Sequence, residues 1–313
     1  MKLLVIVGPT AVGKSRVALK VAEKVPLEII SADSMQVYRG MDIGTAKPTP
    51  EERRRVVHHL VDILDPDQEF SVADFKGEVE TLIPEINRRG RIPALVGGTG
   101  LYIDAVLKGY IFPDLAKDQE LRKKLREEAE SRGSRHLHQK LAQVDPAAAK
   151  HIHPNDARRI IRALEVYQKT GKPLTALEGK RNGGQYDTLS FGLTMDRGTL
   201  YQRIEKRVEQ MIQDGFLDEV TALYEAGCRA DSVAMQALGY RELLDYLRGL
   251  VTWEETVRLI KRNTRRFAKR QYTWFRRNKE IRWIKLDEGK GVEDAAKEIV
   301  RAIASKWKIV YNG

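Results

Sequence analysis

Short apolar runs alternate with amphipathic stretches along this chain, and each of the first runs ends in a loop of small or polar residues. We interpret runs of this kind as buried strands at residues 3–7, 27–32, 93–96, 188–194 and 281–286, with 59–64 as a further candidate. Helical periodicity follows the first run at residues 15–24, where Val17, Ala18, Val21 and Ala22 share one face. Strands that alternate with helices predict a parallel, doubly wound α/β sheet, with ligands bound at the carboxyl ends of the strands.

The middle of the chain has a different pattern. Residues 119–132, 135–143 and 155–170 are helical in periodicity, and no convincing strand lies between Pro113 and the Gly183-Gly184 loop. We therefore expect a helical insertion domain at 114–186 in a core domain formed by 1–113 and 187–313. After the insertion, residues 200–226 predict one long amphipathic helix.

Composition limits the class of protein. The 313 residues are 42% hydrophobic and 32% charged, as in a soluble globular protein. No apolar run approaches the roughly 20 residues of a membrane span, and residues 1–7 are too short for a signal peptide. The single cysteine, Cys228, excludes an intrachain disulfide and a cysteine-built zinc site. We expect a cytoplasmic monomer that does not associate with membranes.

The net charge of +11 is concentrated near the C-terminus. Residues 261–282 contain one acid, Glu280, and aromatic residues interleaved with ten cations: Lys261, Arg262, Arg265, Arg266, Lys269, Arg270, Arg276, Arg277, Lys279 and Arg282. A solvated helix face is the ordinary explanation of a basic stretch, but like charges at helical spacing repel one another. The segment favours a polyanionic partner.

A phosphate-binding loop follows the first expected strand. Residues 8–15, Gly-Pro-Thr-Ala-Val-Gly-Lys-Ser, fit the pattern G-x-x-x-x-G-K-[ST] between a strand and a helix. The glycines let successive backbone amides face a phosphate chain, Lys14 supplies a charge, and the Ser15 hydroxyl can join the coordination of Mg²⁺. The motif indicates a polyphosphate ligand without identifying it.

Two further loops are expected at the same edge of the sheet. Asp33 follows the second strand, where it can either accept a proton from a substrate or cap the next helix, and the sequence leaves both roles open. Gly97-Gly98-Thr99-Gly100 follows the third strand, and its glycines would let the backbone approach a ligand closely.

Other polar residues carry no expected chemistry. The adjacent His58 and His59 point apart on a strand or helix and make poor joint metal ligands, so we assign them a structural role, with Asp62 nearby. Residues 122–130 mix cations and acids as a solvated helix does.

Taken together, the motifs resemble those of the tRNA dimethylallyltransferases, also called tRNA isopentenyltransferases, in their bacterial form. The blocks that carry the resemblance are in order and cover nearly the whole chain: 8–15, 31–38, 42–48, 58–60, 97–102, 156–165, 239–242 and 265–274. The 114–186 stretch matches more loosely.

The resemblance implies dimethylallyl diphosphate as donor, tRNA as acceptor and Mg²⁺ as cofactor. Asp33 would be the general base on N6 of the adenosine 3′ of the anticodon, assisted by Thr99. The implied diphosphate ligands are Gly8, Thr10, Ala11, Val12, Gly13, Lys14 and Ser15, with an arginine, Arg203 or Arg207, to complete the clamp. The implied tRNA contacts are Asp33, Ser34, Met35, Gln36, Thr99, Asp156, Ala157, Arg158, Arg159, Ile160, Gly239, Tyr240, Arg241, Arg265, Arg266, Lys269, Arg270 and Gln271.

Two other functions use part of the same pattern. A small-molecule or nucleotide kinase explains the phosphate loop and Asp33 but leaves the basic, aromatic 261–282 segment without a purpose. A non-catalytic tRNA-binding protein explains that segment but leaves both glycine loops idle.

Overall fold

The computed structural model describes residues 1–113, 115–180, 186–287 and 289–309. It divides into two compact units, residues 1–107 with 185–313 and residues 108–184. The second unit begins a few residues before the expected boundary at 114. Asp114 itself and the Gly183-Gly184 loop lie outside the described residues.

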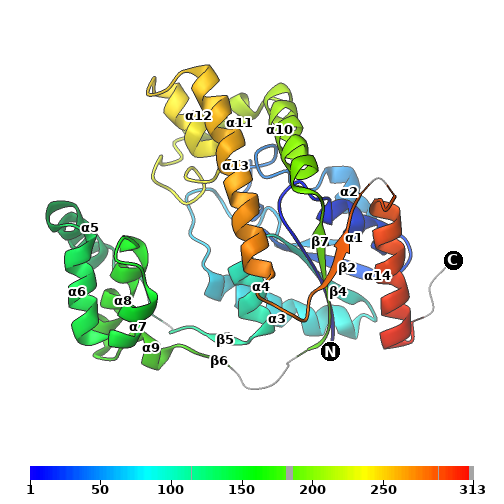
Figure 1. Cartoon of the computed structure of the whole chain (residues 1–313), viewed down its shortest axis with the longest axis horizontal. Coiled ribbons are helices and arrows are strands. Elements are labelled where there is room, and N and C mark those ends of the chain that lie inside the picture. The colour runs from blue at the N-terminus through cyan, green and yellow to red at the C-terminus, as the bar shows by residue number, and fades with distance from the viewer. Residues whose placement is uncertain (114, 181–185, 288, 310–313) are drawn as a thin grey trace. The chain divides into compact units, whose positions relative to one another are not determined.

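The first unit is built on a parallel sheet of six strands (Figure 1). Their order is β3-β2-β4-β1-β7-β8, where β1 is Lys2–Val7, β2 Leu27–Ala32, β3 His58–His59, β4 Ile92–Gly97, β7 Asp187–Thr194 and β8 Arg282–Lys285. Gly97 at the end of β4 is in register with Val7 of β1 and with Ala32 of β2. The three loops that follow these strands therefore leave the sheet at one edge. The predicted doubly wound, P-loop-like α/β fold is confirmed.

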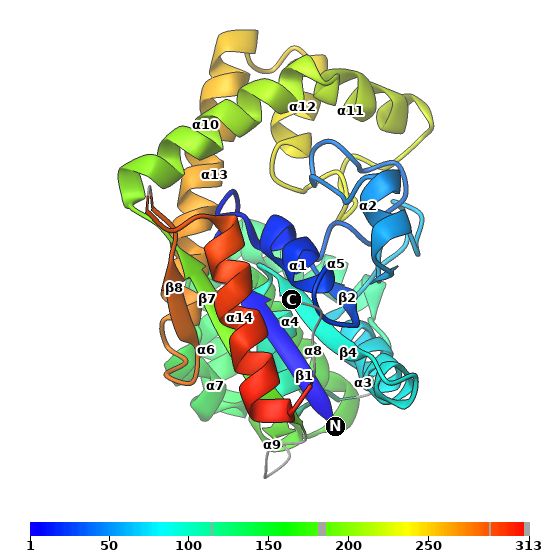
Figure 2. The same cartoon turned by 90° about the vertical axis from the view of Figure 1, so that its right-hand side faces the viewer.

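Helices cover both faces of this sheet. On β1, Leu4 and Ile6 pack into the core beneath α1 (Lys14–Ala22) and α14 (Val292–Trp307), whereas Leu3 and Val5 pack into the core of the opposite face. That face is covered by α3 (Val72–Arg88) and α4 (Gly100–Leu107) (Figure 2). Because these strands are buried on both faces, their sequences are continuous apolar runs rather than alternating apolar and polar residues.

The described residues of this unit form five more helices: α2 (Pro50–Arg55), α10 (Arg197–Gln213), α11 (Phe216–Glu225), α12 (Tyr240–Leu247) and α13 (Trp253–Phe275). The prediction of one helix over 200–226 was wrong. Gly215 adopts φ 95°, a left-handed conformation that ends α10 and starts α11 in a new direction. The candidate strand at 59–64 was also wrong beyond His59, because Leu60 and Asp62 have φ of 60° and 56°, which a strand does not allow.

The second unit is a bundle of α5 (Gln119–Arg132), α6 (Ser134–Val144), α7 (Pro146–His151), α8 (Ala157–Thr170) and α9 (Leu174–Leu177) around its own apolar core. The expectation that it holds no strand was wrong, since β5 (Tyr110–Ile111) and β6 (Gly179–Lys180) pair antiparallel. The view of 122–130 as a purely solvated face was also wrong. Arg122 donates two hydrogen bonds to the fully buried Glu165, which Arg162 contacts as well.

Candidate functional site

The loop after β1 has the conformation of a phosphate cradle. Gly8 and Gly13 have φ of 149° and 109°, and a Cβ on Gly8 would lie 2.7 Å from the Leu193 carbonyl oxygen, so only glycine fits there. Among the described residues no side chain caps the N-terminus of α1, which leaves its first backbone amides available to an anion. Ser15 is exposed at this helix start.

Lys14 lies inside this loop, where its ammonium donates a 2.9 Å hydrogen bond to the Pro9 carbonyl. Burial lowers the pKa of Lys14, the negative charge of Asp33 opposes this change, and the positive charge of Arg207 adds to it, so that the pKa lies at about 8. The charges of Asp33 and Arg207 therefore both interact electrostatically with the Lys14 ammonium at the phosphate loop. Such a pair of cations beside one carboxylate suits an anionic ligand.

Arg207, and not Arg203, is the arginine of this group. Both lie on α10, one turn apart, but Arg203 is exposed whereas Arg207 is half-buried. Burial lowers the pKa of the Arg207 guanidinium, and the Asp33 carboxylate opposes that change. Of the two arginines that the sequence left open, Arg207 is therefore the one that interacts with Lys14 and Asp33.

Asp33 and Thr99 are brought together by the ends of β2 and β4. The Asp33 carboxylate accepts a 2.9 Å hydrogen bond from the Met35 N–H, as in an Asx turn. The next helix, α2, is capped by Thr49, so the alternative role of Asp33 as a helix cap was wrong. The Thr99 hydroxyl accepts a 3.2 Å bond from the Ser34 N–H, and the Thr99 N–H donates to the Ala32 carbonyl. A hydroxyl that accepts from an amide keeps its own proton for another acceptor. Within the described part of the chain, one oxygen of Asp33 and the proton of Thr99 remain for a ligand.

The glycines of the second glycine loop lie close against neighbouring parts of the protein. A Cβ on Gly97 would lie 2.2 Å from the Ala32 carbonyl oxygen. Cβ atoms on Gly98 and Gly100 would lie 2.1 Å from Gln271 Nε2 and 2.3 Å from the Trp274 ring, both on α13. The glycines therefore allow α13 to approach the edge of the sheet.

Several expected tRNA contacts are used inside the protein, because their side chains or amides already have partners. Gln271 is only 6% exposed, and Ile160 and Tyr240 are fully buried. The Tyr240 hydroxyl donates a 2.6 Å bond to Glu219, and burial raises the pKa of Tyr240. Gly239 donates its N–H to the buried Glu242, and Arg241 contacts the same carboxylate. A motif shared by a family marks structural residues as well as contacts.

Gln36 is likewise occupied. Its side-chain oxygen accepts from the Ser31 hydroxyl at 2.8 Å, and its amide nitrogen donates to the Thr45 and Ala46 carbonyls. These bonds tie the segment that contains Asp33 to the loop at 42–47. The adjacent Asp33, Ser34 and Met35 are half-buried and keep some exposed surface.

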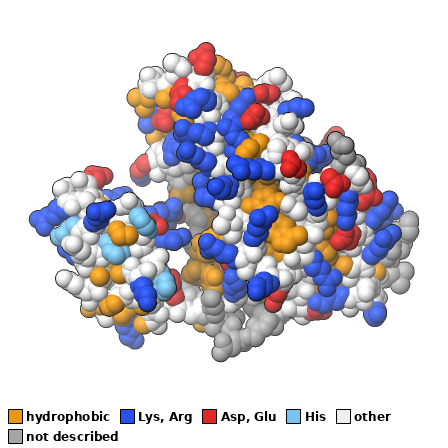
Figure 3. Space-filling view, viewed as in Figure 1, with side chains coloured by type: hydrophobic (Ala, Val, Ile, Leu, Met, Phe, Trp, Pro, Cys, Tyr) orange, Lys and Arg blue, Asp and Glu red, His pale blue; other side chains and the backbone are white. Residues whose placement is uncertain are grey.

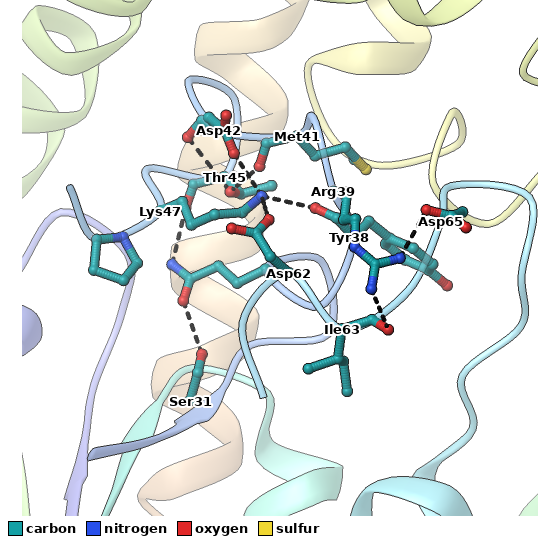
Figure 4. A network of polar contacts seen from close by, with 12 residues as sticks. Ser31, Tyr38, Arg39, Met41, Asp42, Thr45, Lys47, Asp62, Ile63 and Asp65 are labelled. Carbon is teal, nitrogen blue, oxygen red and sulfur yellow. Dashed lines mark hydrogen bonds and ion pairs between the residues drawn. The ribbon is translucent and has the colours of Figure 1, made fainter. Parts of the chain in front are cut away.

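The loop at 42–47 is held by two acidic residues outside it, Glu219 and Asp62, and no motif indicated that role for either. The Glu219 carboxylate accepts from three successive backbone amides, those of Asp42, Ile43 and Gly44. Figure 4 shows the Lys47 ammonium between Asp42 and Asp62, with a third bond to the Tyr38 carbonyl. An acid inside a helix, such as Glu219, has no sequence signal that separates it from a surface residue.

A pocket of about 660 Å³ lies between this loop and α10, and Lys47, Arg53 and Arg207 contribute cations to its wall. Asp42, Asp62 and Asp214 contribute acids, and Ile43, Pro48 and Met211 contribute apolar surface. The pocket is next to the Lys14–Asp33–Arg207 group because Arg207 belongs to both.

Most of the basic segment lies on α13, where Lys and Arg side chains gather on the surface (Figure 3). Arg266, Lys269 and Arg270 are exposed. Arg265, in contrast, is paired with Glu205 of α10 at 2.6 Å. In the second unit, Arg158 and Arg159 are exposed at the start of α8, after the capping residue Asp156 and the half-buried Ala157.

The histidines have the structural roles expected of them. His58 Nδ1 bonds to the Val56 carbonyl and His59 Nε2 to Glu28, each at 2.7 Å, so the rings face different partners. Asp62 pairs with Lys47 and Arg53 instead. Among the described residues no group of three or more His, Cys, Asp or Glu side chains could hold a metal ion, and no helix has the length and apolar composition of a membrane span.

Comparison with known proteins identifies the family. Residues 36–278 match the family described as IPP transferase, and residues 1–62 match the one described as Isopentenyl transferase. The chain belongs to the IPP transferase family. The resemblance that its motifs carry is confirmed.

Relatives within this family are similar over nearly the whole length of this chain. The tRNA dimethylallyltransferase of Symbiobacterium thermophilum is 56% identical over 311 residues, covering 98% of this chain and 96% of that protein. The tRNA isopentenylpyrophosphate transferase of Bacillus halodurans has a similar structure, with 47% identity, a TM-score of 0.72 and coverage of 98% and 97%. A eukaryotic dimethylallyltransferase acting on tRNA gives 30% identity and a TM-score of 0.79, over 98% of this chain and 79% of that one.

Proposed function

We propose that this IPP transferase moves a dimethylallyl group from dimethylallyl diphosphate to N6 of the adenosine 3′ of the anticodon in tRNA, releasing diphosphate. The observation that carries the proposal is the group formed by Asp33, Lys14 and Arg207 beside the phosphate loop, where no described side chain caps the N-terminus of α1. A carboxylate between two cations can face a nucleophile on one side while the cations face an anionic leaving group on the other. The similarity to tRNA dimethylallyltransferases supports tRNA as the acceptor and a dimethylallyl group as the group transferred.

Each of these residues has a separate role in one nucleophilic substitution at the allylic carbon. The N6–carbon bond forms as the bond between the allylic carbon and the diphosphate oxygen breaks, and Asp33 takes the proton from N6. Base assistance is needed because the lone pair of an adenine amine is delocalised into the ring. The amides at the start of α1, Lys14 and Arg207 stabilise the charge that grows on the diphosphate. The Thr99 hydroxyl accepts from the Ser34 N–H, so its own proton would serve to orient Asp33 or the incoming amine.

Mg²⁺ fits this site through one side chain, the exposed Ser15 hydroxyl at the N-terminus of α1. Magnesium is often held by few protein ligands together with substrate phosphates and water, so the lack of a carboxylate cluster among the described residues agrees with binding of this kind. When bound, the ion would neutralise part of the diphosphate charge.

Contacts with tRNA are assigned to the exposed cations. Arg266, Lys269 and Arg270 on α13 form one surface, and Arg158 and Arg159 of the second unit form another. Phosphate contacts of this type position an RNA without reading its bases. The base itself must leave its stack to reach Asp33. We assign this activity to a monomer in the cytoplasm.

The deciding experiment follows label from two donors in parallel. The protein is incubated with unmodified tRNA, Mg²⁺ and either labelled dimethylallyl diphosphate or ATP labelled in its γ-phosphate. Prenylated nucleoside from the first donor and no transfer from the second is the expected result. Label that moves from ATP to any acceptor, with none from the allylic donor, would establish a kinase instead.

The role of Asp33 is tested in the same assay. Asp33→Asn keeps the shape of the side chain and its bond from Met35 but removes its basicity, so turnover should fall about 100-fold while tRNA binding survives. Asp65→Asn is the matched control, since Asp65 pairs with Arg39 at an exposed site. Near-normal turnover of Asp33→Asn at saturating substrates rules out its role as the base.

A further inference from the structure

Gln271 connects two loops that are far apart in the sequence. Its side-chain oxygen accepts a 2.8 Å hydrogen bond from the Thr10 N–H of the phosphate loop. Its amide nitrogen donates a 3.0 Å bond to the Gly98 carbonyl, next to Thr99. Both bonds lie at the carboxyl edge of the sheet, and the side chain is only 6% exposed. One amide therefore fixes the distance between the loop expected to hold the diphosphate and the loop that carries Thr99.

The packing around this bridge is tight. A Cβ on Gly98 would lie 2.1 Å from Gln271 Nε2, so no side chain can be added there while Gln271 keeps its place. One turn further along α13, the Trp274 indole donates a 3.0 Å bond to Asp104 of α4 and covers Gly100. Gln271 and Trp274 therefore pack the inner face of α13 against the second glycine loop.

The outer face of the same helix carries the exposed cations. Lys269 and Gln271 are two residues apart, so their side chains project about 200° apart around the helix. A phosphate chain on Lys269 thus contacts the opposite side of α13 from the bridge. Since α13 is one continuous helix from Trp253 to Phe275, the outer cations and the inner bridge belong to the same element.

We propose that Gln271 is a positioning residue that keeps the phosphate loop and the Thr99 loop in register with the RNA-facing helix. The inference rests on the proposed function and goes beyond it, because it makes the donor site depend on a residue of the helix that contacts tRNA. Without the bridge, the Thr10 N–H and the Gly98 carbonyl lose their partner and the two loops lose their fixed spacing. Donor binding and turnover then suffer, whereas tRNA affinity does not.

The first test separates the two ligands. Gln271→Met keeps the length of the side chain and removes both hydrogen bonds. Binding of inorganic pyrophosphate to the tRNA-free protein should weaken about tenfold, which corresponds to roughly one lost hydrogen bond. The dissociation constant for tRNA should stay within about twofold, and kcat should fall with the pyrophosphate affinity. Lys269→Ala should show the reverse split. Loss of tRNA affinity in Gln271→Met, with unchanged pyrophosphate binding, overturns the proposal in favour of a direct RNA contact.

A double-mutant cycle tests the bridge itself. Gly98→Ala displaces Gln271, so it should weaken pyrophosphate binding as Gln271→Ala does. In the double variant the shortened side chain leaves room for the new methyl group, and binding should be no weaker than in either single variant. Losses that multiply would show that the two positions act independently and would overturn the proposal. Because pyrophosphate binding is the readout, the cycle remains decisive even if the wild-type protein fails to prenylate tRNA, a result that would count against the proposed function alone.

Discussion

The ammonium of Lys47 lies 2.5 Å from a carboxylate oxygen of Asp62, and its side chain is only 2% exposed. Arg53 pairs with the other oxygen of Asp62 at 2.6 Å. Burial alone would raise the pKa of Asp62, but the hydrogen bonds from Lys47 and Arg53 outweigh it and hold that pKa below its usual value. The loop beyond Asp33 is thus fixed in place by a buried cation and the acids around it.

Removing one acid from this network should cost stability. Asp62→Asn leaves the Lys47 ammonium buried with one fewer carboxylate, and we expect the free energy of unfolding to fall by about 3 kcal/mol. Asp65→Asn is the matched control, because the Arg39–Asp65 pair is exposed and should be worth less than about 1 kcal/mol. Urea unfolding of the three proteins measures both values, and equal losses would contradict the assignment.

The helical unit should be sensitive to acid through Glu165. Burial raises the pKa of this carboxyl, but the bonds from Arg122, the Asp118 N–H and Arg162 lower it to about 2. A carboxyl with a depressed pKa stabilises the fold above its unfolded pKa and loses that contribution as the pH falls through the folded value. Glu165→Gln should therefore cost about 3 kcal/mol at pH 7. The gap between the variant and the wild type should close between about pH 4.5 and 2, as followed by helical circular dichroism.

Arg207 and Arg203 provide a matched pair on one helix. Arg207→Ala removes a charge that acts on Lys14 and Asp33, so kcat/KM for dimethylallyl diphosphate should fall about 100-fold. Arg203→Ala, at an exposed position, should leave it near the wild-type value. The assignment of Arg207 to the diphosphate is wrong if the two variants behave alike.

The outer face of α13 should govern the salt dependence of tRNA binding. Neutralising Arg266, Lys269 and Arg270 should reduce the slope of log K against log salt by about 0.7–0.9 for each RNA phosphate that these cations neutralise in the wild type. Arg265→Ala should change the slope less, because that guanidinium is already paired with Glu205. Binding is measured with an unmodified tRNA over a range of KCl. An unchanged slope in the triple variant would assign the RNA to another surface.

The fold and the phosphate loop could be predicted because both have local signals. Apolar runs mark the strands, and the G-x-x-x-x-G-K-[ST] pattern marks a loop whose ligands are consecutive residues. The break at Gly215 was missed because the apolar positions of α10 and α11 continue one another across it. A single glycine in a helical pattern is weak evidence of an end.

The roles of individual residues within the motifs could not be predicted in the same way. Gln271 and Tyr240 stand in motifs that the resemblance assigns to tRNA, yet their partners, Thr10, Gly98 and Glu219, are distant in the sequence. Burial decides whether such a side chain faces a ligand or the protein, and burial depends on packing that no local pattern describes. The choice of Arg207 over Arg203 has the same origin.

The lowered pKa of Lys14 predicts how donor use depends on pH. In the free protein Lys14 is charged below about pH 8 and neutral above it, because burial and Arg207 destabilise the ammonium. If that charge binds the diphosphate, kcat/KM for dimethylallyl diphosphate should decline as the pH rises through about 8. At saturating donor the decline in kcat should move to higher pH, since the bound diphosphate stabilises the ammonium. Lys14→Arg provides the control: a guanidinium stays charged throughout this range, so the variant should be slower but should show no decline near pH 8. A decline that persists in Lys14→Arg would assign the titration to a different group, and a flat wild-type profile would show that the charge of Lys14 does not limit donor capture.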